Sequence, residues 1–397
     1  MFAFCMAETM IACRNLLALC RRLFGVAVLA VCLAMLSGVA ALAQAQAQGA
    51  SSATGADVAA TPASGTRPPT WIGVPRVSGR LRAADIGVVI NTADPASVQV
   101  GEYYIAARKL SPEHVLRVEL PVRAALSRDE FSRLSTLIDA HFGRQVQALA
   151  LAWTQPYAVE CNGLSGALAL GFDGELCKQG CKASRPSSYF NSGSARPMGD
   201  HGIRLSMLLA GRTVEQAKAL IDRGVAADGS LLLRGRPSVN ALMLTTDDAA
   251  RGVRTVLYPP SGPLRPVGVE VQTLPSTALS RTPRVLLAIT GSVAPPVDPA
   301  PDWVPGGLGD HLTSYGGDLL GPHGQGTALD WLASGATASY GTVSEPCNHL
   351  QKFPHPQVLL GQYLLGVTAI EAYWKSVAWP QQGLFVGEPL AAPFSRP

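Results

Sequence analysis

The chain has 397 residues, with 32 Lys and Arg against 28 Asp and Glu, so its formal net charge is +4. Arg14, Arg21, Arg22 and Glu8 give the first 43 residues a charge of +2, which leaves +2 on the remainder. A nearly neutral body without a basic stripe argues against nucleic acid as a partner.

Residues 1–43 have the pattern of a secretory signal peptide. Arginines precede the uncharged apolar run Leu23–Leu36, and the small-x-small pattern Ala41-Leu42-Ala43 follows it. The run is shorter than the roughly 20 apolar residues that span a membrane. We therefore predict cleavage near Ala43 and a periplasmic or secreted protein with no stable membrane span after cleavage. A retained N-terminal anchor is the alternative.

Beyond the signal, residues 44–80 are rich in Ala, Gln, Ser, Thr, Gly and Pro, which predicts a flexible linker. From there to residue 394 the pattern is that of an α/β domain. Short apolar runs predict strands at 86–90, 115–120, 146–153, 240–245, 253–257, 284–290, 335–342 and 383–386.

Helical patterns lie between these runs. Ser97 is placed to cap a helix that reaches Leu110, and Ser127-Arg128-Asp129-Glu130 forms a capping box for a helix through His141. Two further capping boxes start at Thr213, with Gly224 as the helix end, and at Thr368. The β-α-β-α-β order predicts a three-layer sandwich around a mostly parallel sheet. The domain over 81–394 is either one unit or two intimate halves split near 230–280.

Four cysteines remain after signal cleavage: Cys161, Cys177, Cys181 and Cys347. An even number in an oxidising compartment predicts two disulfides, and the spacing leaves all three pairings open. Free buried thiols are the alternative. A zinc site at Cys177-x-x-x-Cys181 lacks a second close-spaced ligand pair.

Two groups of residues offer catalytic chemistry. Asp310, His311 and Ser314 contain the residue types of a hydrolase triad. The alternative is that Asp310 and His311 cap or brace the glycine-rich turn that follows. Cys347 would be a nucleophile if His349 or His355 served as its base, whereas a structural disulfide is the simpler interpretation. Asp310, His311, Asp318 and His323 include residue types that bind metal ions, but we predict no metal site. Because the sequence has no phosphate loop or dinucleotide motif, we also predict no cofactor.

Several strings resemble an uncharacterised family of exported bacterial proteins. They include NTADPASVQVGEYYIAARKL, DHLTSYGGDLLG and ASYGTVSEPCNHLQKFPHPQVLLGQYL, and the likeness spans about residues 85–394. That family occurs in species with exosortase, the proposed transpeptidase that sorts proteins carrying a short C-terminal Pro-Glu-Pro signal. The resemblance implies a context of envelope sorting or exopolysaccharide export, with envelope or sorting-system proteins as partners, and implies no activity.

A fainter resemblance is to gingipain-type cysteine peptidases, which have a caspase-like fold. Gly335-Ala336 to Gly341-Thr342, followed by a helix and then Gly387-Glu388-Pro389, is similar to the end of their domain. Where they carry the catalytic histidine and cysteine, this chain has Gly291-Ser292 and Thr313-Ser314. We therefore expect an accessory or binding protein, with a peptidase-like hydrolase whose site lies near 310–318 and 347 as the alternative.

Overall fold

The computed structural model describes residues 70–232 and 237–396, all within the compact unit Arg67–Pro397. The predicted signal peptide and residues 44–69 of the predicted linker lie outside these ranges. Residues 70–82 contain neither helix nor strand. Among the described residues, none of the helices combines the length and apolar character needed to cross a membrane.

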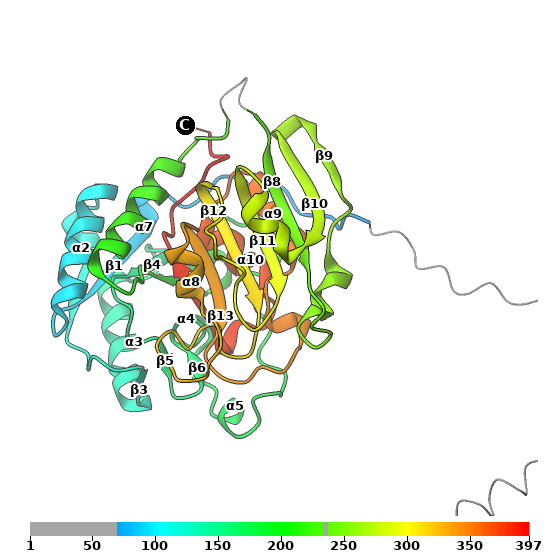
Figure 1. Ribbon diagram of the computed structural model, residues 1–397. Helices are drawn as coiled ribbons and strands as arrows, with labels where there is room; N and C mark the ends of the chain where they lie inside the picture. Colours follow the sequence, from blue (N-terminus) through cyan, green and yellow to red (C-terminus); the bar gives the residue numbers. More distant parts are fainter. Residues whose placement is uncertain (1–69, 233–236, 397) are drawn as a thin grey trace, which may run out of the picture. The chain divides into compact units, whose positions relative to one another are not determined.

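One sheet of eleven strands runs through the whole unit (Figure 1). In spatial order its strands are β2(Val115–Val118), β1(Ile86–Asn91), β4(Ala148–Leu151), β7(Leu205–Leu208), β14(Gly383–Gly387), β13(Ala338–Thr342), β12(Trp303–Leu312), β11(Val285–Gly291), β8(Val239–Thr245), β10(Val269–Pro275) and β9(Gly262–Leu264). A separate small sheet contains β3(Ala125–Leu126), β5(Ala158–Val159) and β6(Asn162–Gly163).

The large sheet consists of two parallel blocks that run in opposite directions. β2 to β14 are mutually parallel, and so are β13 to β10. The blocks meet at the antiparallel pair β14–β13, and β9 adds an antiparallel edge. The carboxyl ends of the two blocks therefore lie at opposite edges of the sheet.

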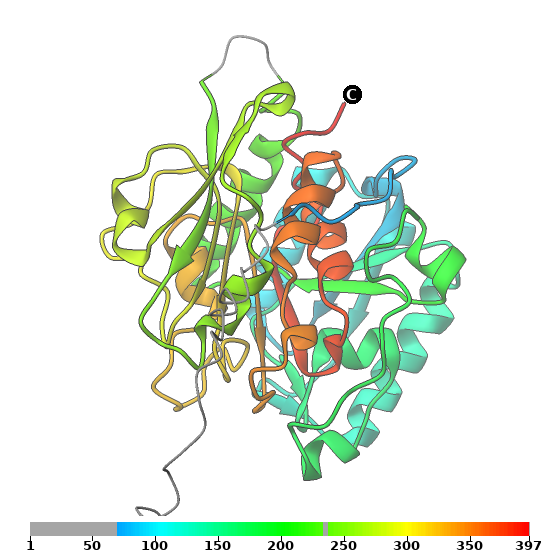
Figure 2. The same ribbon diagram turned by 90° about the vertical axis from the view of Figure 1, so that its right-hand side faces the viewer.

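Helices cover both faces, which confirms the predicted three-layer α/β architecture (Figure 2). Successive strand residues pack on opposite faces of the sheet: Val88 and Met207 belong to a first core, and Val89 and Leu208 belong to a second. A third, smaller core contains Leu242 and Leu244 of β8. The first core also receives α2(Pro95–Arg108), α9(Pro356–Leu364) and α10(Ala369–Ser376). The second receives α3(Arg128–Phe142) and α8(Ala328–Ala333), while α4(Leu164–Leu170) and α7(Val214–Ala227) contribute to both. The short helices α5(Glu175–Lys178) and α6(Pro197–His201) lie in the long segment before β7.

Local capping signals identified several helices correctly. Ser127 and Glu130 form the predicted capping box of α3, and Thr368 and Glu371 form that of α10. Thr213 caps α7 by accepting a hydrogen bond from the backbone N–H of Gln216. The predicted N-cap of α2 is wrong, because Asp94 and not Ser97 caps this helix. The Ser97 hydroxyl instead accepts a hydrogen bond from the Asn91 backbone N–H at 2.9 Å.

Two other local predictions are wrong. Residues 253–257, predicted as a strand, lie in the 3₁₀ helix η3(Gly252–Leu257). In this helix Arg254 is buried and forms an ion pair with Asp310, whereas Val256 is exposed. Gly224 does not end α7, which continues to Ala227. It sits where a Cβ would come within 2.3 Å of Glu388 Cγ, so the glycine permits close packing against that side chain.

Candidate functional site

The structure does not assemble the predicted triad. Asp310 and His311 are successive residues of β12, so their side chains point to opposite faces of the sheet. The Asp310 carboxylate forms a fully buried ion pair with Arg254 of η3. Ser314 lies beyond the strand, and its carbonyl accepts from Thr342 Oγ1 at 2.9 Å. In residues 70–232 and 237–396, the Ser314 hydroxyl makes no hydrogen bond to a histidine.

His311 is held by two hydrogen bonds inside the fold. Its Nδ1 accepts from Trp331 Nε1 of α8 at 3.0 Å, so Nε2 carries the proton and donates to the Gly326 carbonyl, also at 3.0 Å. Burial lowers the pKa of His311 to about 4. A neutral imidazole with both nitrogens engaged is a structural brace between β12 and α8 and cannot activate a nucleophile in this arrangement.

This brace should make the protein sensitive to acid. The unfolded chain binds the proton near pH 6.5 and the folded one only near pH 4, so stability is lost as the pH falls through this window. At about 1.4 kcal/mol per pKa unit, the loss attributable to His311 is about 3 kcal/mol. We expect urea unfolding of the wild type to lose that much more between pH 7 and pH 4 than His311→Gln does. Equal pH slopes in the two proteins would contradict the assignment.

All four cysteines of the body are paired. Cys161 bonds to Cys177, and Cys181 bonds to Cys347, which selects one of the three pairings left open by the sequence. Cys347 therefore has no free thiol to act as a nucleophile in this structure. His349 is exposed beside Trp379, with 6.1 Å between ring centroids, and His355 is the N-cap residue of α9.

The residues weighed as metal ligands are divided among separate places. Asp310 pairs with Arg254 and His311 bonds to Trp331, whereas Asp318 Oδ2 and His323 Nε2 lie 2.9 Å apart. Asp318 also accepts from Tyr157 Oη at 2.5 Å. Across the residues that the structure describes, no three His, Cys, Asp or Glu side chains gather as a metal site. The Asp318 cluster instead fastens the loop after β12 to the segment that follows β4.

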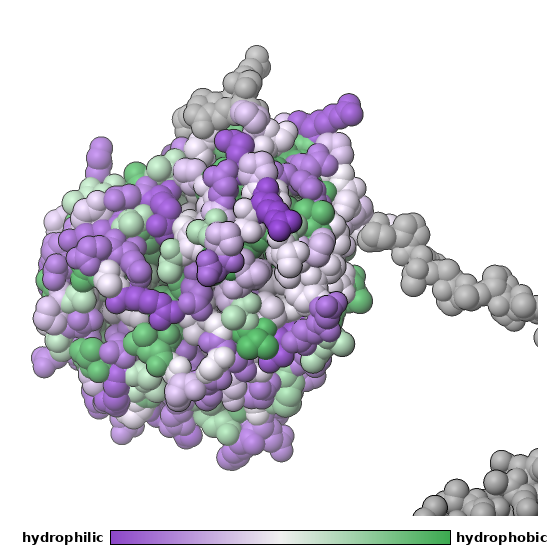
Figure 3. All heavy atoms as spheres, in the orientation of Figure 1, coloured by the Kyte–Doolittle hydropathy of each residue, from purple (hydrophilic) through white to green (hydrophobic). Residues whose placement is uncertain are grey.

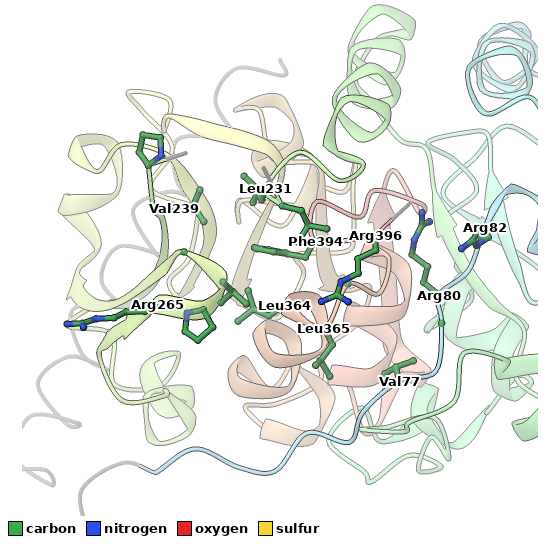
Figure 4. Close-up of a pocket in the computed structure, with 17 residues that line it drawn as sticks. Val77, Arg80, Arg82, Leu231, Val239, Arg265, Leu364, Leu365, Phe394 and Arg396 are labelled. Carbon is green, nitrogen blue, oxygen red and sulfur yellow. The ribbon is translucent and has the colours of Figure 1, made fainter. Parts of the chain in front are cut away.

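A pocket of about 680 Å³, which we name the arginine pocket, lies elsewhere in the fold. It borders the amino ends of β8 and β10, away from the carboxyl edge where ligands of α/β sheets usually bind. Figure 4 shows its labelled lining residues: Val77, Arg80, Arg82, Leu231, Val239, Arg265, Leu364, Leu365, Phe394 and Arg396. Pockets of this size suit drug-sized ligands.

Several separate segments build the arginine pocket, and backbone hydrogen bonds join two of them. The Gly229 and Leu231 N–H groups, after α7, donate to the carbonyls of Ala392 and Pro393 at 3.0 Å each. These bonds hold the C-terminal segment, with Phe394 and Arg396, beside the start of β8 (Figure 4). The 77–82 segment, residues 265–268 and the end of α9 complete the lining.

The electrostatic character of this pocket is one-sided. Four arginines line it and no aspartate or glutamate does. Among the ion pairs of the described residues, none involves Arg80, Arg82, Arg265 or Arg396. Glu371 accepts from the Leu81 backbone N–H nearby at 3.0 Å, but it is buried and outside the pocket. A concentration of unneutralised positive charge in a concave site favours anions.

On the face shown in Figure 3, hydrophobic and hydrophilic residues are interspersed without one large apolar area. Sequence reasoning missed the arginine pocket because its charged residues are scattered from Arg80 to Arg396 and form no motif. No protein-family model, curated protein or solved structure matches the chain.

Proposed function

We propose that this chain is an exported binding protein for an anionic ligand, which it holds in the arginine pocket. The observation that carries the proposal is a pocket lined by four arginines and no carboxylate. Guanidinium groups donate paired hydrogen bonds that match phosphate, sulfonate and carboxylate groups. The two disulfides fit an oxidising compartment outside the cytoplasm, and the first 43 residues supply the expected export signal.

The envelope-sorting context belongs to the proposal through the resemblance to the exosortase-associated family. We propose that the protein is an accessory component of such a system, presenting or carrying an anionic molecule. We also propose that the protein has a fold related to that of gingipain-type peptidases but lacks their catalytic groups. In support, β13 and β14 pair as the closing strands, Gly291-Ser292 lies at the end of β11, and Thr313-Ser314 follows β12.

Anion binding can be tested with 8-anilinonaphthalene-1-sulfonate, a fluorescent sulfonate. We expect saturable fluorescence enhancement with the native mature protein, and an affinity at least about tenfold weaker in Arg80→Gln/Arg396→Gln, since two charged hydrogen-bond donors are removed. The control is Arg133→Gln, because Arg133 is exposed on α3 and does not line the pocket. Equal affinities in all three proteins would refute the assigned site.

The hydrolase alternative predicts a different outcome. A serine or cysteine hydrolase with its site near 310–318 and 347 would react at Ser314 with a fluorophosphonate, or at Cys347 with iodoacetamide. We expect neither residue of the non-reduced protein to be modified, because His311 is committed to Trp331 and Cys347 to Cys181. Stoichiometric labelling of either residue, read by mass spectrometry, would favour the hydrolase.

A further inference from the structure

We infer that the ligand of the arginine pocket is a single-chain amphiphile: an alkyl chain that carries a phosphate or carboxylate head. This inference rests on the proposed function, which requires only the anionic head, and adds the alkyl chain. A site for a small anion requires only donors and positive charge, whereas this pocket also has a wall of apolar side chains beside its arginines.

The apolar wall has a buried floor and an exposed rim. Val239 and Phe394 are buried, and the Phe394 ring lies edge-on to Tyr363 with 6.3 Å between centroids, so the floor is well packed. Leu232 and Leu365 at the rim are 41% and 48% exposed. An alkyl group bound in the pocket would cover these two exposed side chains and remove their apolar surface from water.

Charge and apolar surface are separated within the pocket. Figure 4 shows Arg80, Arg82 and Arg396 on one side of Phe394 and Leu364, with Arg265 on the opposite side. A ligand that satisfies the three arginines with its head would therefore extend its chain over the leucines and Phe394. The segregation favours a molecule with one charged end over one with charges along its length.

The volume of the pocket suits a ligand with one alkyl chain. At about 680 Å³ the pocket is in the range that encloses a drug-sized molecule. Each methylene buried against the wall contributes about 0.8 kcal/mol of binding free energy. A short stretch of alkyl chain can therefore raise the affinity by up to several orders of magnitude over that of the head alone. An alkyl phosphate or fatty-acid carboxylate, free or released from a membrane, has this chemistry.

Three probes separate head from chain, each used below the concentration at which it forms micelles. Lysophosphatidic acid has both parts, glycerol 3-phosphate has only the head, and lysophosphatidylcholine has the same chain with a zwitterionic head. We expect lysophosphatidic acid to displace the sulfonate dye from the mature protein with at least about 30-fold higher affinity than either other probe.

Variants then assign each part of the ligand to its side of the pocket. Arg80→Gln/Arg396→Gln should remove the preference for lysophosphatidic acid over lysophosphatidylcholine. Leu365→Ser should weaken both lysolipids about tenfold and leave glycerol 3-phosphate unchanged. Leu365 is already half-exposed, so this substitution leaves the folded core intact. Leu137→Ser, equally exposed on α3 and outside the pocket, is the control.

The outcomes distinguish this inference from the proposed function. If glycerol 3-phosphate competes as well as lysophosphatidic acid, the alkyl chain is not recognised and the amphiphile inference fails while anion binding stands. If the two lysolipids bind with equal affinity, the pocket does not distinguish an anionic head from a zwitterionic one, and the inference also fails. If neither dye nor phosphate binding depends on the arginines, the proposed function itself is wrong.

Discussion

Replacing Arg254 with methionine should destabilise the protein by about 3–5 kcal/mol, because it leaves the Asp310 carboxylate buried without its partner. The Arg254 side chain is 1% exposed and that of Asp310 is fully buried. Arg254 Nη2 also donates to the Thr290 carbonyl at 2.7 Å and Nη1 to the Pro354 carbonyl at 3.3 Å, so two acceptors lose their donor as well. Urea unfolding at pH 7 measures the loss.

The pH dependence of this variant has a definite sign. Burial raises the pKa of Asp310, and Arg254 opposes that rise. Without Arg254 the folded-state pKa lies further above the unfolded one, so the variant gains relative stability at low pH and loses it as the pH rises through the folded pKa. The deficit against wild type should therefore shrink on acidification.

Two matched variants test the explanation. Arg254→Met/Asp310→Leu should recover most of the stability, since replacing both members of a buried pair is often nearly neutral. Arg117→Met, which breaks an exposed pair with Glu102, should cost less than about 1 kcal/mol. If the single Arg254 variant is no less stable than Arg117→Met, the buried pair has no special role.

The layered fold was predictable because its elements carry local signals. Buried strands such as Ile86–Asn91 are continuous apolar runs, and Ser127 and Thr368 identify helix starts by their own side-chain hydrogen bonds. The joining of the two parallel blocks was not predictable in this way. β14 pairs with β7 and β13, which both come earlier in the chain. The local sequence pattern of Gly383–Gly387 does not indicate which strands it pairs with.

The errors at the predicted site have a physical reason too. Asp310 and His311 were grouped because they are adjacent in sequence, yet adjacent residues of a strand face opposite layers. On one face His311 accepts a hydrogen bond from Trp331 of α8, and on the other Asp310 forms an ion pair with Arg254 of η3. The arginine pocket escaped prediction for the converse reason. Arg80 and Arg396 are 316 positions apart in the chain and line one pocket only in the folded protein, where the C-terminal segment is bonded to residues 229–231.

Removal of the Cys181–Cys347 disulfide should destabilise the protein more than removal of Cys161–Cys177. The first closes a loop of 166 residues and the second one of 16. In the chain-entropy model these loops are worth about 5 and about 3 kcal/mol. We expect Cys181→Ser/Cys347→Ser to lose about 2 kcal/mol more than Cys161→Ser/Cys177→Ser in urea unfolding under non-reducing conditions.

A buried lysine adds to the cost of losing the longer bridge. Lys352 Nζ donates to the Gly180 carbonyl at 2.6 Å, one residue before Cys181, and to Gln382 Oε1 at 2.7 Å. Burial lowers the pKa of Lys352 to about 8, so its ammonium depends on these acceptors at neutral pH. Release of Cys181 loosens one of them. Lys352→Met in the Cys181→Ser/Cys347→Ser background should therefore cost less than Lys352→Met in the wild type, and equal costs would separate the lysine from the bridge.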